Sequence, residues 1–350
     1  MLLRTPLKLT VLATTWCNVR CGHCLNNAGP ARQDRVSYSQ MRACIERVHA
    51  WHPLKVVIFT GGECSILGED LLDAIAFCDS LGIVTRIVTN AYWATSEAEA
   101  ARRLTALREA GLAEINFSVD DFHQQYIPLD RVKYAWRVSK GMGFLAVVIA
   151  NTTGPRSTMT PDYLRAALGE NVASIIYSKS CPRPLPRPCA DGTRYFISEA
   201  RLSRLGRARQ QLADDYFCTF TPEQLSGPCI DLLLNPTLTA WNHLAGCCGV
   251  EALGNDIIDL GDLAEMDPVD ILEKADKHLI LNGLALFGPS ALLRFVKAVA
   301  PEIELRGRYS NACDMCEEIC RRPDVTAVLE KHAATLAGKV LAEREARGLC

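Results

Sequence analysis

The chain has 350 residues, of which 49% are hydrophobic and 22% charged, and its formal net charge is -2. These values are typical of a globular protein with one large domain and a smaller one. The near-neutral net charge gives no electrostatic reason to expect binding to nucleic acid or to an anionic membrane surface. The longest obvious apolar run, Phe144 to Ala150, is far shorter than the ~18 residues of a membrane helix. We therefore expect neither nucleic acid nor a membrane as a partner.

The chain contains 16 cysteines, which is a high number for its length. Its first residues do not form a signal peptide, because Arg4, Pro6 and Lys8 interrupt the apolar stretch and no small-residue cleavage site follows. Cysteines in an intracellular chain indicate metal binding or catalysis rather than a disulfide framework. We therefore expect a cytoplasmic protein that uses its cysteines for metal chemistry.

Lys8 to Ala13 is predicted to be a buried strand, and a cysteine loop leaves its C-terminal end with Cys17, Cys21 and Cys24. Eight residues can turn three thiolates toward one point. Zinc sites usually have four ligands, so a zinc site here needs His23 or a distant cysteine as the fourth. A four-iron cluster held by three thiolates instead keeps one iron open to a cofactor or substrate. The spacing favours such a cluster.

Further strand-then-helix units follow along the chain, and polar residues come after each strand. Six such units predict an open, parallel, six-stranded barrel with its site at the C-terminal strand ends. A doubly wound sheet is the alternative, but it would not gather ligands from so many strand ends. The later strands are predicted at Lys55–Thr60, Thr85–Thr89, Glu114–Val119, Leu145–Ala150 and Ala173–Tyr177. The residues at or just after the strand ends include Gly61, Gly62, Glu63, Asn90, Ser118, Asp120 and His123.

His123 has two interpretations on this pattern. It is either a general base or proton relay, or it has no direct chemical role and is a solvated loop histidine or one that orients Asp120.

A second group of cysteines lies in the C-terminal third. Asp231 to Trp241 is predicted to be a hairpin around an Asn235-Pro236 turn, which would bring Cys229 and Cys247 together. Cys313 and Cys316 form a CxxC pair, and two separated pairs can assemble one four-thiolate metal site. The remaining cysteines of this region include Cys248 and Cys320.

The CxxxCxxC loop, the Gly-Gly-Glu element and the Ser-Val-Asp-Asp-Phe-His-Gln segment together resemble the radical S-adenosylmethionine (SAM) superfamily. The resemblance implies a [4Fe-4S] cluster on Cys17, Cys21 and Cys24 that binds SAM and cleaves it to a 5'-deoxyadenosyl radical. It implies SAM contacts from Gly61, Gly62, Glu63, Asn90, Ser118 and Asp120. Cys64 stands where the family usually has proline; we favour a plain replacement over a hydrogen donor beside the SAM pocket.

The C-terminal cysteine pattern resembles the auxiliary-cluster extensions called SPASM and twitch. This implies an auxiliary iron-sulfur cluster on Cys229, Cys247, Cys313 and Cys316. Cys248 and Cys320 are then either substitutes for one of these ligands or, like Cys64, candidate hydrogen donors. The expected fold is α/β, a partial (β/α)6 TIM-like barrel at 1–197, a connecting helix and linker at 198–228, and a smaller α+β auxiliary-cluster domain at 229–350.

The resemblance implies a radical SAM enzyme that abstracts hydrogen from a substrate, with a ribosomally made peptide undergoing crosslinking, epimerisation or oxidation as the leading class. An electron donor such as flavodoxin or ferredoxin is implied. Because the barrel begins within ten residues of Met1, either a separate protein recognises a leader peptide or the substrate is small. The alternatives are a small-molecule epimerase or dehydrogenase acting on a sugar or antibiotic precursor, and a non-catalytic metal-binding scaffold.

Overall fold

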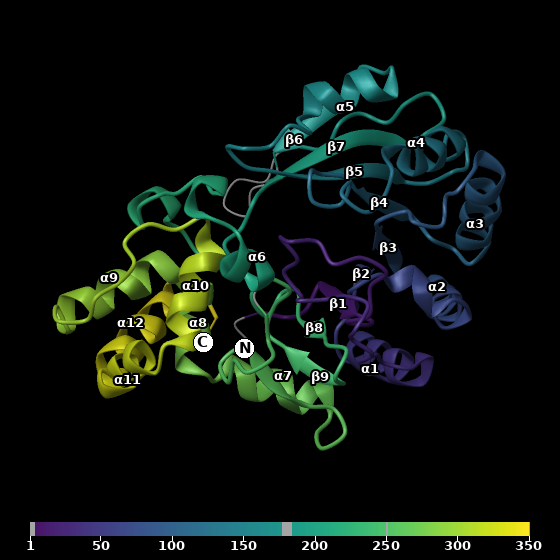
Figure 1. Ribbon diagram of the computed structural model, residues 1–350. Coiled ribbons are helices and arrows are strands. Elements are labelled where there is room, and N and C mark those ends of the chain that lie inside the picture. Colours follow the sequence, from purple (N-terminus) through teal and green to yellow (C-terminus); the bar gives the residue numbers. More distant parts are fainter. Residues whose placement is uncertain (1–3, 177–183, 250, 350) are drawn as a thin grey trace.

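The computed structural model describes residues 4–176, 184–249 and 251–349. Its centre is one ten-stranded sheet in the order β10-β9-β8-β1-β2-β3-β4-β5-β7-β6 (Figure 1). The strands are β1(Lys8–Leu12), β2(Val56–Thr60), β3(Val84–Thr89), β4(Glu114–Ser118), β5(Ala146–Thr153), β6(Ala173–Ile176), β7(Arg194–Arg201), β8(Thr237–Leu238), β9(His243–Ala245) and β10(Asp259–Asp262).

β1 to β5 pair in parallel in sequence order, and helices after each strand cover the outer face of the curved sheet (Figure 1). Leu9 and Val11 of β1 pack on this face in one buried cluster with Met41 and Ile45 of α1. Consecutive strand order has no reversal point, so the doubly wound alternative is wrong. The predicted α/β fold with a partial barrel is confirmed. The helices are α1(Tyr38–Trp51), α2(Glu69–Ser80), α3(Glu97–Glu109), α4(Leu129–Val138) and α5(Pro161–Leu168).

The sixth strand of the barrel differs from the prediction. Ala173–Ile176 does form a strand, β6, and Tyr177 lies outside the described residues. However, β7 lies between β5 and β6 and pairs with β5 over eight residues. Phe196 and Ile197 of β7 are buried, whereas β6 is mostly exposed. The longer strand therefore takes the inner position, and the strand nearer in sequence takes the edge.

The C-terminal third extends the same sheet, because β8 pairs with β1 in parallel and β9 folds back on β8. The hairpin was predicted at the wrong position. Its strands are β8 and β9, and its turn contains Asn242 in a left-handed conformation, φ 62°. The Asn235-Pro236 pair instead precedes β8, and the carbonyl oxygen of Pro236 accepts a hydrogen bond from the Thr10 amide at 2.9 Å. The remaining helices are α6(Gly206–Gln211), α7(Pro268–Asp276), α8(Leu279–Leu286), α9(Pro289–Val299), α10(Ala312–Arg321), α11(Pro323–Lys331) and α12(Ala333–Ala346).

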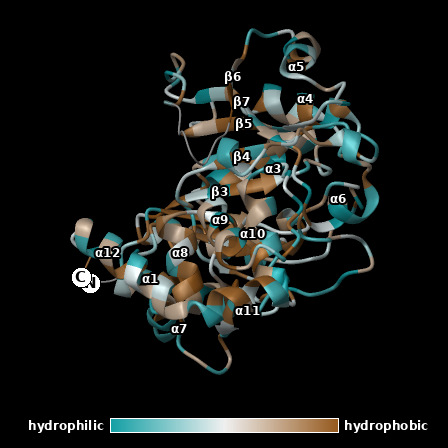
Figure 2. Cartoon of the chain, turned by 90° about the vertical axis from the view of Figure 1, so that its left-hand side faces the viewer, coloured by the Kyte–Doolittle hydropathy of each residue, from teal (hydrophilic) through white to brown (hydrophobic). Residues whose placement is uncertain are grey.

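Two main hydrophobic clusters hold these parts together, one between the barrel strands and their helices and the other among α8 to α12. Figure 2 shows the hydrophobic segments in the interior and hydrophilic ones on the outer helices. Within the described part of the chain, no single helix is long and apolar enough to cross a membrane. The bent pair α8 and α9, at 117° to each other, passes that test by length and composition alone.

Candidate active site

The C-terminal ends of β1 to β4 bring the predicted N-terminal site residues to one rim of the barrel. The cysteine loop follows β1, and Gly61 is the first residue after β2. Asn90 follows β3, and Ser118 is the last residue of β4. Because these strands are parallel, their ends point the same way, and residues far apart in sequence become neighbours.

The cysteine loop is largely buried. Cys17 and Cys21 are 6% and 5% exposed, and Cys24 is partly exposed. The amide of Cys24 donates to the carbonyl oxygen of Cys21 at 3.2 Å, which closes a turn between two of the thiols. Burial raises the pKa of Cys17 to about 12 and also raises the pKa of Cys21. These thiols therefore stay neutral unless a metal compensates the thiolate charge.

Helix α6 forms hydrogen bonds to the cysteine loop through Arg207. Arg207 is 4% exposed, and its guanidinium donates to the carbonyl oxygens of Cys21, at 2.7 Å, and of Ala28. Its backbone amide donates to the carbonyl oxygen of Cys24 at 2.9 Å. A Cβ on Gly206 would lie 2.2 Å from the carbonyl oxygen of Leu25, so only glycine permits this approach. The sequence analysis missed Arg207, because no local pattern marks a contact across 186 residues.

Gly61 and Gly62 let two backbone segments meet. A Cβ on Gly62 would lie 2.0 Å from the carbonyl oxygen of Trp16, and one on Gly61 would lie 2.4 Å from that of Thr14. The amide of Gly62 donates to the carbonyl oxygen of Thr14 at 2.6 Å. The glycines thus fix the start of the cysteine loop against the end of β2.

Glu63 lies below this junction and is 1% exposed. Its Oε1 accepts hydrogen bonds from the hydroxyls of Ser65, at 2.7 Å, and Thr89, at 2.8 Å. Its Oε2 accepts one from the backbone amide of Asn90 at 2.7 Å. Burial raises the pKa of Glu63, while these donors act in the opposite direction. The carboxylate therefore ties the end of β2 to the end of β3.

Asp120 joins two histidines. Its Oδ2 lies 3.1 Å from Nε2 of His23 and 2.9 Å from Nδ1 of His123. Burial acts to raise the pKa of Asp120, but the two imidazoles hold it well below its usual value. Burial acts to lower the pKa of His123, yet Asp120 raises it. Both histidines thus contact Asp120, in line with the orienting interpretation of His123.

Asn90 links the third strand to the cysteine loop. Its Nδ2 donates to Oδ1 of Asn18 at 3.0 Å and lies 3.9 Å from the sulfur of Cys17. This places an amide beside the first cysteine of the loop. Ser118 is partly buried at the next strand end.

The donor set fits a [4Fe-4S] cluster. Three cysteines share one buried loop, and no protein donor is required for a fourth iron that binds a cofactor. Cluster thiolates bind different irons, so their sulfurs are further apart than ligands of a single ion. Consistent with this, the described residues contain one trio of potential ligand atoms within 4.8 Å, and it includes Cys21 but neither Cys17 nor Cys24.

Most of the C-terminal cysteines come together around one hydrophobic cluster. Cys247 and Cys320 are buried within it, and Cys229, Cys313 and Cys316 pack against it. The sulfurs of Cys316 and Cys320 lie 3.9 Å apart on α10. Cys320, which the sequence analysis kept as an alternative ligand, thus lies one helical turn from Cys316.

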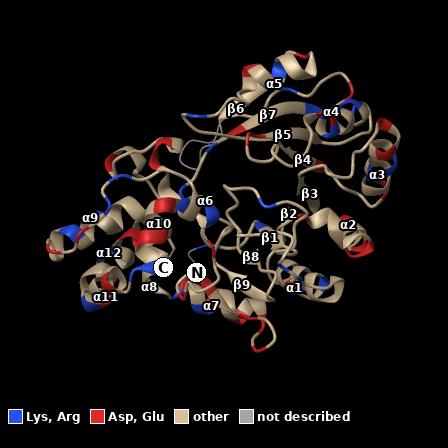
Figure 3. Cartoon of the chain, viewed as in Figure 1, with Lys and Arg blue, Asp and Glu red and all other residues tan. Residues whose placement is uncertain are grey.

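Helix α10 also carries the buried carboxylates of Asp314, Glu317 and Glu318, visible as an acidic group in Figure 3. Arginines neutralise them: Glu317 binds Arg209 of α6 at 2.6 Å. Since Arg207 on the same short helix binds the cysteine loop, α6 connects both cysteine groups.

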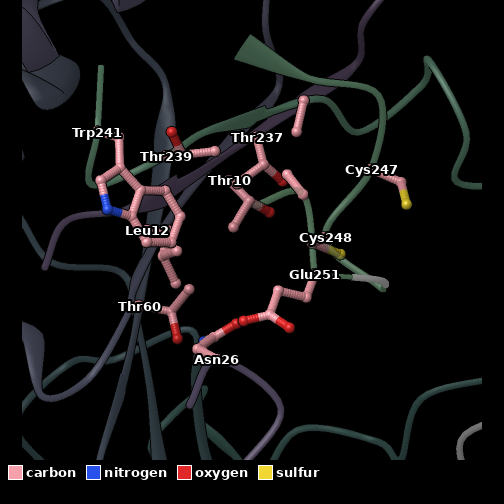
Figure 4. Close-up of a pocket in the computed structure, with 12 residues that line it drawn as sticks. Thr10, Leu12, Asn26, Thr60, Thr237, Thr239, Trp241, Cys247, Cys248 and Glu251 are labelled. Carbon is pink, nitrogen blue, oxygen red and sulfur yellow. The ribbon is translucent and has the colours of Figure 1, made fainter. Parts of the chain in front are cut away.

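A pocket lies between Asn26, which follows the cysteine loop, and the C-terminal Cys247 and Cys248; its enclosed space is about 50 Å³, and its open mouth brings the total to about 470 Å³. Figure 4 shows Trp241 on one side, and Cys248 and Glu251 on the other. Glu251 accepts a hydrogen bond from Asn27 of the cysteine loop at 2.9 Å, and its other oxygen lies 3.6 Å from Arg321 of α10. The pocket wall contains four threonines, Thr10, Thr60, Thr237 and Thr239.

The three candidate hydrogen donors occupy different surroundings. Cys64 is fully buried, and its thiol donates to the carbonyl oxygens of Phe59, at 3.6 Å, and Val88, at 3.5 Å. This arrangement favours the structural interpretation of Cys64. Cys248 lines the pocket, where its sulfur accepts from Nδ2 of Asn235 at 3.4 Å. Cys320 lies in the C-terminal hydrophobic cluster.

Comparison with known proteins agrees with this geometry. Residues 11–143 match the model of the radical SAM superfamily. No curated protein sequence matches the chain. The matched residues include the cysteine loop and the ends of β1 to β4, so the candidate site lies within the radical SAM match.

Among solved structures, the chain is similar to SuiB of Streptococcus suis bound to S-adenosylmethionine, with 15% identity and a TM-score of 0.51. This match covers 77% of the chain, and the chain spans 66% of the length of SuiB. It also matches BtrN in complex with AdoMet and 2-DOIA (11% identity, TM-score 0.45, covering 91% of this chain and 92% of that one). A third match is methylornithine synthase PylB (15% identity, TM-score 0.38, covering 56% and 55%).

Proposed function

We propose that this protein is a radical SAM enzyme that reductively cleaves SAM at a cluster on Cys17, Cys21 and Cys24 and abstracts hydrogen from a substrate. The observation that carries the proposal is the buried three-cysteine loop at the mouth of a parallel barrel, within the radical SAM domain. When bound, the cluster and SAM supply a reducing electron and a 5'-deoxyadenosyl radical. An external electron donor, such as flavodoxin or ferredoxin, provides the electron.

The protein's own residues position these groups. Arg207 and Gly62 fix the cysteine loop from two sides. Gly61, Glu63, Asn90, Ser118 and Asp120 lie on the rim where SAM contacts are proposed. Since Glu63 already accepts hydrogen bonds from Ser65, Thr89 and Asn90, its proposed role includes holding Asn90 in place as well as facing the SAM amino group.

We further propose an auxiliary iron-sulfur cluster at Cys229, Cys247, Cys313 and Cys316, with Cys248 and Cys320 as alternative ligands. Its support is that these residues border one hydrophobic cluster or the adjoining pocket. The division into 1–197, 198–228 and 229–350 remains a proposal: β7 (Arg194–Arg201) crosses its first boundary, and one sheet includes strands from both ends of the division.

The leading substrate is a ribosomally made peptide, of which one side chain enters the pocket between the cysteine groups. A small polar molecule, such as a sugar or antibiotic precursor, is the second candidate. Four threonines and Glu251 in the pocket wall favour this second class, because they offer several hydrogen-bonding groups to a polar ligand.

The test is anaerobic incubation of the reconstituted protein with SAM, dithionite and panels of both substrate classes, followed by mass spectrometry. Loss of two hydrogens indicates oxidation or crosslinking, and uptake of solvent deuterium without other mass change indicates epimerisation. The matched control is Cys21→Ala. Turnover of small molecules but no peptide would overturn the leading substrate class. Equal products from the control would overturn the enzymatic proposal.

A further inference from the structure

We propose that Cys21, His23 and His123 form a binding site for a single zinc-type divalent ion, and that this ion and the iron-sulfur cluster are alternative occupants of the cysteine loop. One ligand atom from each residue lies within 4.8 Å of the other two. The site draws two ligands from the loop after β1 and one from the segment after β4. The ion site itself does not rest on the proposed function, whereas the exclusion of the cluster by the ion rests on the proposed cluster at Cys17, Cys21 and Cys24.

The donor types suit zinc. One thiolate and two imidazoles are common ligands of this ion, with bonds of about 2.0–2.3 Å. Tetrahedral bonds of this length place ligand atoms about 3.3–3.6 Å apart, so a contraction of the existing trio completes the site. Water takes the fourth tetrahedral position, and the proton of the Cys21 thiol leaves to solvent when the ion binds.

Asp120 gives the two histidines the support that metal-binding histidines usually have. It engages Nε2 of His23 and Nδ1 of His123 with the same oxygen. Its other oxygen accepts the backbone amides of Phe122, at 3.0 Å, and His123, at 2.9 Å. A carboxylate fixed in this way sets the ring orientation and tautomer of both imidazoles, leaving one nitrogen of each for a metal.

His23 carries the second observation that points to a ligand. Its side chain is 10% exposed, and it stacks on Phe122 with ring centroids 4.6 Å apart. Its Nδ1 is buried and has no hydrogen-bond partner among the described residues. A buried polar atom without a partner is costly, and a bound ion would satisfy it.

The shared ligand makes the two occupants exclusive. Cys21 is common to the ion site and to the proposed cluster, while Cys17 and Cys24 serve the cluster alone and the histidines serve the ion alone. Zinc bound at this site therefore blocks cluster assembly on the loop. Replacing either histidine removes a ligand of the ion and leaves all three cysteines in place. Such a variant therefore tests ion binding separately from cluster binding.

Cobalt(II) is the probe, because its thiolate and ligand-field bands report coordination. The metal-free protein is titrated with Co2+, and the spectrum of Cys21→Ala is subtracted to remove binding by the C-terminal cysteines. Cys17→Ser should keep the difference band, and His123→Gln should lose it. Asp120→Asn should weaken Co2+ binding about 10–100-fold, as expected for the loss of a supporting carboxylate.

A reconstitution experiment supplies the second readout. One equivalent of Zn2+ added before iron and sulfide should lower iron uptake by wild type but not by His123→Gln, with circular dichroism showing that the variant is folded. A His23→Gln variant repeats the test at the second histidine. A difference band that survives in both histidine variants and disappears in Cys17→Ser would mean a cysteine-only site and would overturn the proposal. The proposed SAM cleavage would be unaffected by that result.

Discussion

Arg207 donates from Nη1 to the carbonyl oxygen of Cys21 at 2.7 Å, and so a residue beyond the last barrel strand holds the middle cysteine of the loop. The same guanidinium binds the carbonyl oxygen of Ala28. Two residues further along α6, Arg209 binds Glu317 on the cysteine-bearing helix α10. The geometry of the loop therefore depends on the C-terminal half of the chain as well as on β1.

Replacing Arg207 by Gln should loosen the cysteine loop. The buried carbonyl oxygens of Cys21 and Ala28 lose a charged donor, which costs about 1–3 kcal/mol of unfolding free energy. Iron bound by the N-terminal cluster should fall, measured after reconstitution in a Cys316→Ser background that removes one proposed auxiliary ligand. Arg209→Gln is the matched control and should leave this iron in place. An unchanged iron content in Arg207→Gln would contradict a positioning role.

Replacing Glu63 by Gln should destabilise the protein even without SAM. Oε1 accepts from the hydroxyls of Ser65 and Thr89, and Oε2 accepts from the amide of Asn90. A glutamine amide must place its NH2 group, which is itself a donor, at one of these two positions, so at least one hydrogen bond is lost. We expect a loss of about 1–3 kcal/mol in chemical unfolding of the metal-free protein. Glu46→Gln, at an exposed surface ion pair, should change stability by less than about 1 kcal/mol. Equal stability of the two variants would show that the network around Glu63 is unimportant to the fold.

Gly62→Ala should be more damaging than an ordinary helix or loop substitution. The added Cβ would meet the backbone of Trp16 at 2.0 Å, and a backbone segment cannot rotate away as a flexible side chain does. The melting temperature should fall sharply. Gly338→Ala, in α12 with open space around it, should be neutral or raise stability by up to about 1 kcal/mol. Similar melting temperatures for both variants would contradict the close approach.

Cys316→Ser tests the auxiliary cluster. Wild type should bind about four more irons per chain than this variant, because a [4Fe-4S] cluster usually needs four thiolates. Exposed Cys189 provides the control, and Cys189→Ser should match wild type. Iron analysis after anaerobic reconstitution is the measurement. If Cys316→Ser binds as much iron as wild type, the C-terminal cysteines hold no cluster that depends on Cys316.

The sequence predicted correctly the features that are determined by residues close together in the chain. The strand after Lys55 and the placement of polar residues at strand ends follow from periodicity and short motifs. These features need only a few consecutive residues to specify them.

The features that were missed depend on which segments, far apart in the sequence, pair or make contact in the fold. The inner place of β7 is decided by its longer pairing with β5, and the hairpin register is decided by pairing of β8 with β1. The contact of Arg207 with Cys21 joins residues 186 positions apart. The contact of His23 with Asp120 likewise required the fold, since the two residues follow different strands.

The central claim is tested most directly by measuring 5'-deoxyadenosine after anaerobic reconstitution of the chain and incubation with SAM and dithionite. We predict that wild type forms 5'-deoxyadenosine and that Cys21→Ala forms none above background, although both are folded by circular dichroism. No 5'-deoxyadenosine from iron-loaded wild type, or equal amounts from both proteins, would contradict the assignment of SAM cleavage to the Cys17, Cys21 and Cys24 loop.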